Sequence, residues 1–158
     1  SDTASASTVV EHFFDNLPKR LLEKNPYIVY LQPTSPLRTA EHIDDALAEM
    51  MEQDFNKLVS VTLMVKSPFK SFLVDQDGCL KALFDEEMTN RRRQDLPAVY
   101  AANGAIYVFL YSDFKENNAF PSNGSLPYIM NEKDSLDIDT KEDFEIGKLL
   151  YKKFNKNL

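Results

Sequence analysis

The chain has 158 residues and carries 25 acidic against 18 basic side chains, a formal net charge of −7. This length suits one domain with a sizeable core, and 43% hydrophobic with 27% charged residues is typical of a globular protein. The negative charge argues against nucleic-acid binding, and no apolar run approaches the roughly 18–20 residues of a membrane span. The single Cys79 cannot form an internal disulfide, which favours a reducing, cytoplasmic location.

The N-terminal half predicts the order helix, strand, helix, strand. Thr8 and Glu11 have the spacing of a capping box, so a helix is expected to begin near Thr8. The run Tyr27–Leu31 is rich in β-formers without polar alternation, which predicts a central, parallel strand buried on both faces. Thr39 is expected to cap the next helix, and Leu58–Val65 is the next predicted strand. Such a βαβ unit places the loop after its first strand at the carboxyl edge of the sheet.

A hairpin is predicted to follow and to project from the sheet. Phe72–Val74 and Cys79–Phe84 flank the turn sequence Asp75–Gly78, in which the glycine supplies a positive φ. The remaining expected elements are strands at 105–110 and 128–130, a short helix at 112–117 and a last helix opened by Thr140.

Two carboxylates and an amide are the first candidates for chemistry. Asp137 and Asp139 are two residues apart, so in an extended segment both point to one side. Such a pair can hold Mg²⁺, which often rests on one or two carboxylates plus substrate phosphates; alternatively, the pair favours the N-terminus of the following helix. Gln32, at the mouth of the first strand, suits a polyhydroxylated ligand or is satisfied by loop backbone.

Four strings, taken together, resemble the acylneuraminate cytidylyltransferases, which make CMP-activated sialic acids. They are Gln32–Arg38 (QPTSPLR), Asn90–Pro97 (NRRRQDLP), Asn103–Tyr107 (NGAIY) and Asp137–Thr140 (DIDT), and the resemblance extends from Ser1 to about Leu150. It implies one Rossmann-like nucleotidyltransferase domain over residues 1–158, with a mostly parallel sheet flanked by helices. Residues from about 66 to 100 are expected to form a projecting dimerisation region.

The resemblance also implies an activity. It is the transfer of CMP from CTP to the anomeric hydroxyl of a nine-carbon 2-keto sugar acid, with release of pyrophosphate, in a cytoplasmic homodimer that serves lipopolysaccharide or capsule biosynthesis. The matching metal ligands for Mg²⁺ are Asp137 and Asp139, and the matching catalytic residues are Asp139 and Arg93. The matching substrate contacts are Gln32, Lys70, Arg93, Asn103, Tyr107, Phe120 and, in the Ser1–Ser5 string that resembles a cytidine-binding stretch, Ser5.

Some residues have more than one expected role. Lys70 matches a lysine on the projecting region, which in the family reaches the partner subunit's site. Two of the three arginines Arg91–Arg93 are expected to be solvated. Arg38 is a secondary candidate that can instead brace its loop by pairing with Asp44 or Asp45.

The sequence also departs from the family pattern. Family members begin with an Arg-Gly-Gly-Ser-Lys type phosphate-binding segment, and nothing here matches it. We therefore expect roughly two βαβ units ahead of Ser1 and expect residues 1–158 alone to be inactive. Ala101 and Ala102 stand where many members have a basic residue, which leaves the sugar open: legionaminic, pseudaminic and 3-deoxy-octulosonic acids are alternatives. A non-catalytic dimerisation module is the alternative of another class.

Overall fold

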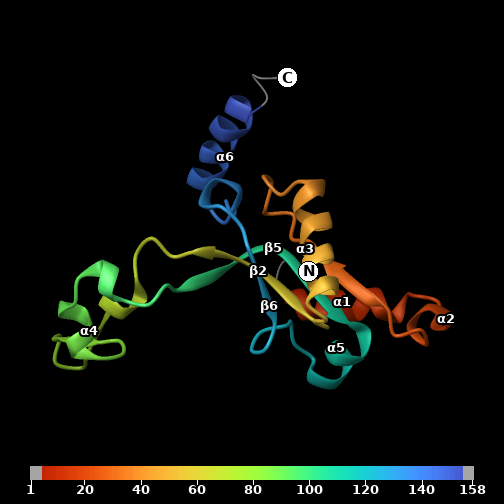
Figure 1. The fold of residues 1–158 in the computed structure, drawn as a ribbon, viewed down its shortest axis with the longest axis horizontal. Helices are drawn as coiled ribbons and strands as arrows, with labels where there is room; N and C mark the ends of the chain where they lie inside the picture. Colours follow the sequence, from red (N-terminus) through yellow and green to blue (C-terminus); the bar gives the residue numbers. More distant parts are fainter. Residues whose placement is uncertain (1–4, 155–158) are drawn as a thin grey trace.

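In the computed structural model, which describes residues 5–154, a four-stranded sheet lies at the centre of the molecule (Figure 1). The strands lie in the order β1-β5-β2-β6. β5 is antiparallel to both neighbours and β2 is parallel to β6, so three strands point one way and β5 points the other. The predicted α/β class is confirmed, with a mixed sheet. The strand bounds are Tyr27–Tyr30 for β1, Leu58–Leu63 for β2, Tyr100–Leu110 for β5 and Leu126–Ile129 for β6.

The prediction that the first strand is central and buried on both faces is wrong. Among the described residues β1 pairs with β5 alone, and its Tyr27 and Val29 side chains are 39% and 36% exposed. Only Ile28 and Tyr30 pack on the apolar cluster beneath the strand. The physical reason is that β5 enters between β1 and β2, so the two strands of the βαβ unit run parallel without pairing.

Helix α3 (Ala40–Glu52) covers one face of the sheet and begins where the sequence predicts. The Thr39 hydroxyl accepts a hydrogen bond from the backbone N–H of His42, and the backbone N–H of Thr39 donates to the His42 ring, so each satisfies a donor at the helix start. Ala46 and Met50, one turn apart, are fully buried. The other members of their buried cluster are Leu58, Ala105, Ile106, Val108, Leu126 and Met130.

Helices α1 (Ala6–Asp15) and α5 (Tyr111–Asn117) pack on the opposite face. The predicted Thr8 start of α1 is corrected to Ala6, because the side chain of Ser5 caps the helix and accepts from the backbone N–H of Thr8. Residues 1–4, which complete the Ser1–Ser5 string, lie outside the described residues. A short helix α2 (Lys19–Leu22) follows α1. The buried residues on this face are Val10, Phe14, Phe109 and Phe114.

Residues 64–99, called the arm below, stand apart from the sheet at the end of the long strands β2 and β5 (Figure 1). The predicted hairpin is present: the Asp75 carboxylate accepts from the backbone N–H groups of Asp77 and Cys79, and Gly78 has φ +78°. The arm comprises the 3₁₀ turns Pro68–Lys70 and Arg93–Asp95, the strands β3 (Phe72–Val74) and β4 (Leu80–Ala82), and the helix α4 (Glu86–Asn90).

The chain then runs from β6 through a 3₁₀ turn (Glu132–Asp134) to helix α6 (Lys141–Phe154). The Thr140 hydroxyl accepts from the backbone N–H of Asp143, and the Asp143 carboxylate accepts from the backbone N–H of Thr140. This confirms the predicted start of the last helix. Within residues 5–154, each helix is too short or too polar to cross a bilayer.

Candidate functional site

A wide bulge interrupts the middle of the sheet. Val59 of β2 pairs with Tyr107 of β5, but Val61 pairs with Ala102, so Ser60 alone lies opposite the segment Asn103–Ile106. We call this segment the β5 bulge. The Ser60 hydroxyl accepts from the backbone N–H of Ile106 at 2.7 Å and donates to the side-chain oxygen of Asn103 at 2.6 Å. It therefore replaces ladder hydrogen bonds that the bulge removes.

Gln32 and Asp137 meet at Gly104, in the β5 bulge. Gly104 has φ +73°, and a Cβ built on it would lie 2.2 Å from Gln32 Oε1 and 3.4 Å from Asp137 Oδ2. The glycine is thus required both by its backbone conformation and by the close approach of the Gln32 amide. The side chains of the QPTSPLR and DIDT strings converge on one backbone position.

The backbones of the two strings are also joined. The backbone N–H of Ile138 donates to the carbonyl of Thr34 at 2.9 Å. Because β1 and β6 run in the same direction, the segments that follow them leave the sheet at the same edge. The two strings therefore converge at this edge of the sheet.

Arg38 braces the loop, though not through the predicted ion pair with Asp44 or Asp45. Its guanidinium donates to the backbone carbonyls of Gln32 at 3.0 Å and Ala105 at 2.8 Å. These bonds tie the loop after β1 to the β5 bulge. Burial lowers the pKa of Arg38 below its ordinary value.

The two aspartates differ in environment. Asp137 is half-buried, and its Oδ1 atom is shielded from solvent without a hydrogen-bond partner among the described residues. Asp139 is exposed, and its backbone N–H donates to the carboxylate of Asp143. The charge of Asp137 also reaches Tyr107. The pKa of Tyr107 is raised above its ordinary value, mainly by burial and next by the negative charge of the Asp137 carboxylate. Within residues 5–154 no cluster of three or more acidic, His or Cys side chains could hold a metal ion.

Tyr107 and Phe120, the two aromatics predicted to line a sugar pocket, do line one pocket. Their ring centroids are 5.3 Å apart, and Phe120 lies 4.8 Å from the ring of Tyr30. The pocket has a volume of about 510 Å³ and lies against the β2 and β5 face that carries Val59, Val61 and Ala102. Its apolar walls and aromatic rings suit the carbon skeleton of a small organic ligand.

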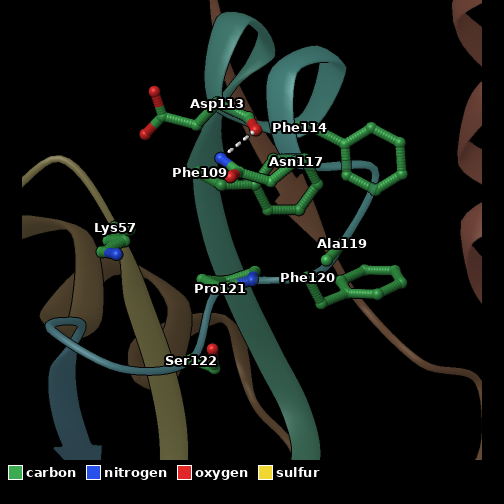
Figure 2. A pocket seen from close by; sticks show the side chains of 9 residues that line it. All are labelled: Lys57, Phe109, Asp113, Phe114, Asn117, Ala119, Phe120, Pro121 and Ser122. Atoms are coloured by element: carbon green, nitrogen blue, oxygen red, sulfur yellow. Dashed lines mark hydrogen bonds between the residues drawn. The ribbon is translucent and has the colours of Figure 1, made fainter.

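A second pocket, of about 330 Å³, lies between α5 and the loop that follows it (Figure 2). Phe120 is its only lining residue that the sequence singled out. The amide of Asn117 donates to the Asp113 carbonyl, and the Lys57 ammonium donates to the Asn123 carbonyl. Because these polar groups already have backbone partners, this pocket is the weaker candidate for ligand binding.

The other predicted site residues lie elsewhere. Lys70 and Arg93 are on the arm, where Lys70 donates to the Thr89 carbonyl and Arg93 donates to the Val65 carbonyl. Arg91 and Arg92 form surface ion pairs with Glu87 and Asp95, whereas Arg93 forms none among the described residues. Ser5 is occupied as the cap of α1.

Asn103 is 5% exposed, and each polar atom of its side chain has an internal partner. Its Oδ1 accepts from Ser60, and its Nδ2 donates to the Ser135 hydroxyl at 2.9 Å and to the sulfur of Met130. Sequence reasoning missed Ser60 and Ser135. A signal for Ser60 existed, because it is the lone small polar residue in the otherwise apolar run Leu58–Val61.

Comparison with known proteins places the chain beside sugar-acid cytidylyltransferases. It is 30% identical over 160 residues to the N-acylneuraminate cytidylyltransferase of Streptococcus agalactiae serotype III, a match covering 96% of this chain and 36% of that protein. It is 34% identical over 128 residues to the enzyme of the same name from Escherichia coli O18:K1:H7, covering 80% and 30%. It is 30% identical over 125 residues to CMP-N,N'-diacetyllegionaminic acid synthase of Legionella pneumophila, covering 78% and 53%.

No protein-family model matches the chain. The chain spans about a third of the length of the first of these relatives. Along nearly all of its own length, it is similar to part of the acylneuraminate cytidylyltransferases, as its four sequence strings predict.

Proposed function

We propose that the protein containing this chain transfers CMP from CTP to the anomeric hydroxyl of a sialic-acid-like 2-keto sugar acid and releases pyrophosphate. The observation that carries the proposal is the convergence of Gln32 and Asp137 on Gly104. It brings together an amide that can bind sugar hydroxyls and a carboxylate whose Oδ1 atom has no hydrogen-bond partner within residues 5–154. The relatives named above, whose names state cytidylyl transfer or CMP-sugar synthesis, support this assignment.

Asp137 and Asp139 are the proposed ligands of Mg²⁺. The shielded, unpartnered Oδ1 of Asp137 fits this role, since a buried carboxylate oxygen normally has a hydrogen-bond donor or a cation beside it. Two carboxylates suffice for Mg²⁺ when substrate phosphates and water supply its other ligands. When bound, the ion would offset negative charge on the phosphates.

The remaining residues bind and orient the sugar acid in this proposal. Tyr107 and Phe120 form the apolar wall of the pocket, and Gln32 lies at the carboxyl edge of the sheet, where it can contact hydroxyl groups. Lys70 and Arg93 supply positive charge for the anionic substrate. Both belong to the arm, which stands apart from the sheet of its own chain (Figure 1), so in this proposal they act at a site that an assembly completes.

That assembly is proposed to be a homodimer formed by the arm. The six most exposed large apolar side chains of its hairpin region are 40–70% exposed: Phe72, Leu73, Val74, Leu80, Leu83 and Phe84. A two-stranded sheet cannot by itself shield these side chains from water, and an exposed apolar patch of this kind marks an interaction surface. A second copy would cover these side chains and bring Lys70 and Arg93 to the partner's sheet edge.

Leu80→Glu is expected to dissociate the dimer. Leu80 is 70% exposed in one chain, and placing a charge there in both subunits should raise the dissociation constant by at least about 100-fold. Sedimentation velocity on the whole protein measures this. Leu149→Glu on α6 is the matched control, since Leu149 is 69% exposed and lies outside the arm. A dimer that survives Leu80→Glu unchanged would remove the arm from the interface.

Pyrophosphate release by the whole protein tests the activity. With CTP, Mg²⁺ and N-acetylneuraminic acid, turnover is expected; legionaminic, pseudaminic and 3-deoxy-octulosonic acids, tested in parallel, identify the sugar that is accepted. A preference for one of those three would assign the protein to that sugar. No release with any acceptor, together with intact dimers that do not bind Mg²⁺, would favour the non-catalytic dimerisation module.

A further inference from the structure

A connected set of hydrogen bonds runs from the core of the sheet to the aspartate-bearing segment. It begins at Ser60 on β2 and passes to Asn103 in the β5 bulge, which also accepts from the backbone N–H of Ala105. The Asn103 amide then donates to the Ser135 hydroxyl at 2.9 Å, and that hydroxyl donates to the Asn131 carbonyl at 2.7 Å. Ser135 lies two residues before Asp137.

The set holds Ser135 firmly because its inner members, Ser60 and Asn103, are buried. Ser60 and Asn103 are 0% and 5% exposed, so water cannot readily replace a hydrogen bond that either side chain loses. A buried network in which every member is satisfied restricts the segments that it joins to one arrangement. The segment after Ser135 is then tied at its other end by the bond from Ile138 N–H to the Thr34 carbonyl.

We propose that Ser60, Asn103 and Ser135 are positioning residues that hold the Asp137 carboxylate beside Gln32 at Gly104. The expected effect on metal binding rests on the proposed function, whereas the hydrogen bonds that hold the segment do not depend on it. Arg38 acts in the same way on the loop side, since its guanidinium holds the carbonyls of Gln32 and Ala105. Both halves of the site are thereby fixed to one bulge of β5.

Ser135→Ala is the test variant, because Ser135 is half-buried and its loss leaves the core residues in place. Ser135→Thr keeps the hydroxyl and is the rescue variant. Thr62→Val is the matched control: Thr62 lies on β2, and its hydroxyl is buried without a partner among the described residues. Amide hydrogen exchange in the whole protein is measured on peptides that cover residues 134–140.

The expected result is exchange at least about tenfold faster at these peptides in Ser135→Ala, with wild-type exchange in Ser135→Thr and Thr62→Val. Mn²⁺ titration followed by electron paramagnetic resonance should show affinity at least about tenfold weaker in Ser135→Ala alone, because residues that orient a metal ligand contribute to metal affinity. Unchanged exchange, or faster exchange with unchanged Mn²⁺ affinity, overturns the positioning role. If wild-type protein binds no Mn²⁺, the proposed metal site fails, while the exchange result still decides whether Ser135 fixes the segment.

Discussion

Asp137→Asn is expected to lower kcat for pyrophosphate release by about 100- to 1,000-fold, the loss of roughly 3–4 kcal/mol that a well-placed charge supplies in a transition state. The fold should tolerate the change, because no described residue donates a hydrogen bond to Asp137 Oδ1 and asparagine has nearly the same shape. The midpoint of thermal unfolding is therefore expected to stay near the wild-type value. Steady-state kinetics of the whole protein with saturating CTP, sugar acid and Mg²⁺ measures the effect.

Asp113→Asn is the matched control for this experiment. Asp113 is also half-buried and borders the second pocket (Figure 2), so the same loss of charge there should leave kcat within about twofold, as for a surface change away from the chemistry. Asp139→Ala should resemble Asp137→Asn in kcat with a small cost in stability, since its side chain is exposed. Ordinary turnover in either aspartate variant would remove that residue from the proposed metal site.

Capping and turn residues in the sequence correctly predicted the elements whose signals are local. The Thr39 cap, the turn at Gly78 and the Thr140–Asp143 pair each fixed an element correctly because both partners lie within four residues. The convergence of Gln32 and Asp137 was also predictable. It follows from two strands that run in one direction and therefore release their loops at the same edge of the sheet.

Long-range features were not predictable from the sequence. The position of β5 depends on where the arm returns to the sheet, and nothing near β1 in sequence indicates that β5 lies beside it. The bulge depends on Ser60 matching the Asn103–Ile106 segment across β2 and β5. Residue type also misled: Arg38 has carboxylates within reach along the chain, yet its guanidinium donates to the backbone carbonyls of Gln32 and Ala105.

Gly104→Ala is expected to disrupt the site more than the fold. Gly104 has φ +73°, and an alanine in this left-handed conformation costs about 1–2 kcal/mol of stability. Its Cβ would also lie 2.2 Å from Gln32 Oε1. The Gln32 amide is the far end of a flexible side chain, so we expect it to move away from position 104 and from the Asp137 carboxylate. Displacement of a binding group by about 1 Å can cost 100-fold in rate, and kcat/KM is expected to fall by about that factor.

Gly124→Ala separates the backbone cost from the contact. Gly124 has φ +75°, and the nearest atom to its added Cβ is 3.7 Å away on the flexible Lys57 side chain. Both variants should therefore lose a similar free energy of unfolding in urea, about 1–2 kcal/mol from the backbone alone, while only Gly104→Ala loses kcat/KM. Equal activity in the two variants would show that Gln32 need not lie at Gly104 for turnover.

A double variant tests whether the Gln32 side chain contributes to activity or only obstructs the alanine at position 104. Gln32→Ala in the Gly104→Ala background removes the Oε1 atom that the new Cβ would meet, so any stability lost to that contact returns. Activity should not return, because the displaced amide is itself the proposed sugar-binding group. Recovery of both stability and kcat/KM would mean that Gln32 only obstructs the alanine, and the sugar contact would then have to come from another residue of the loop after β1.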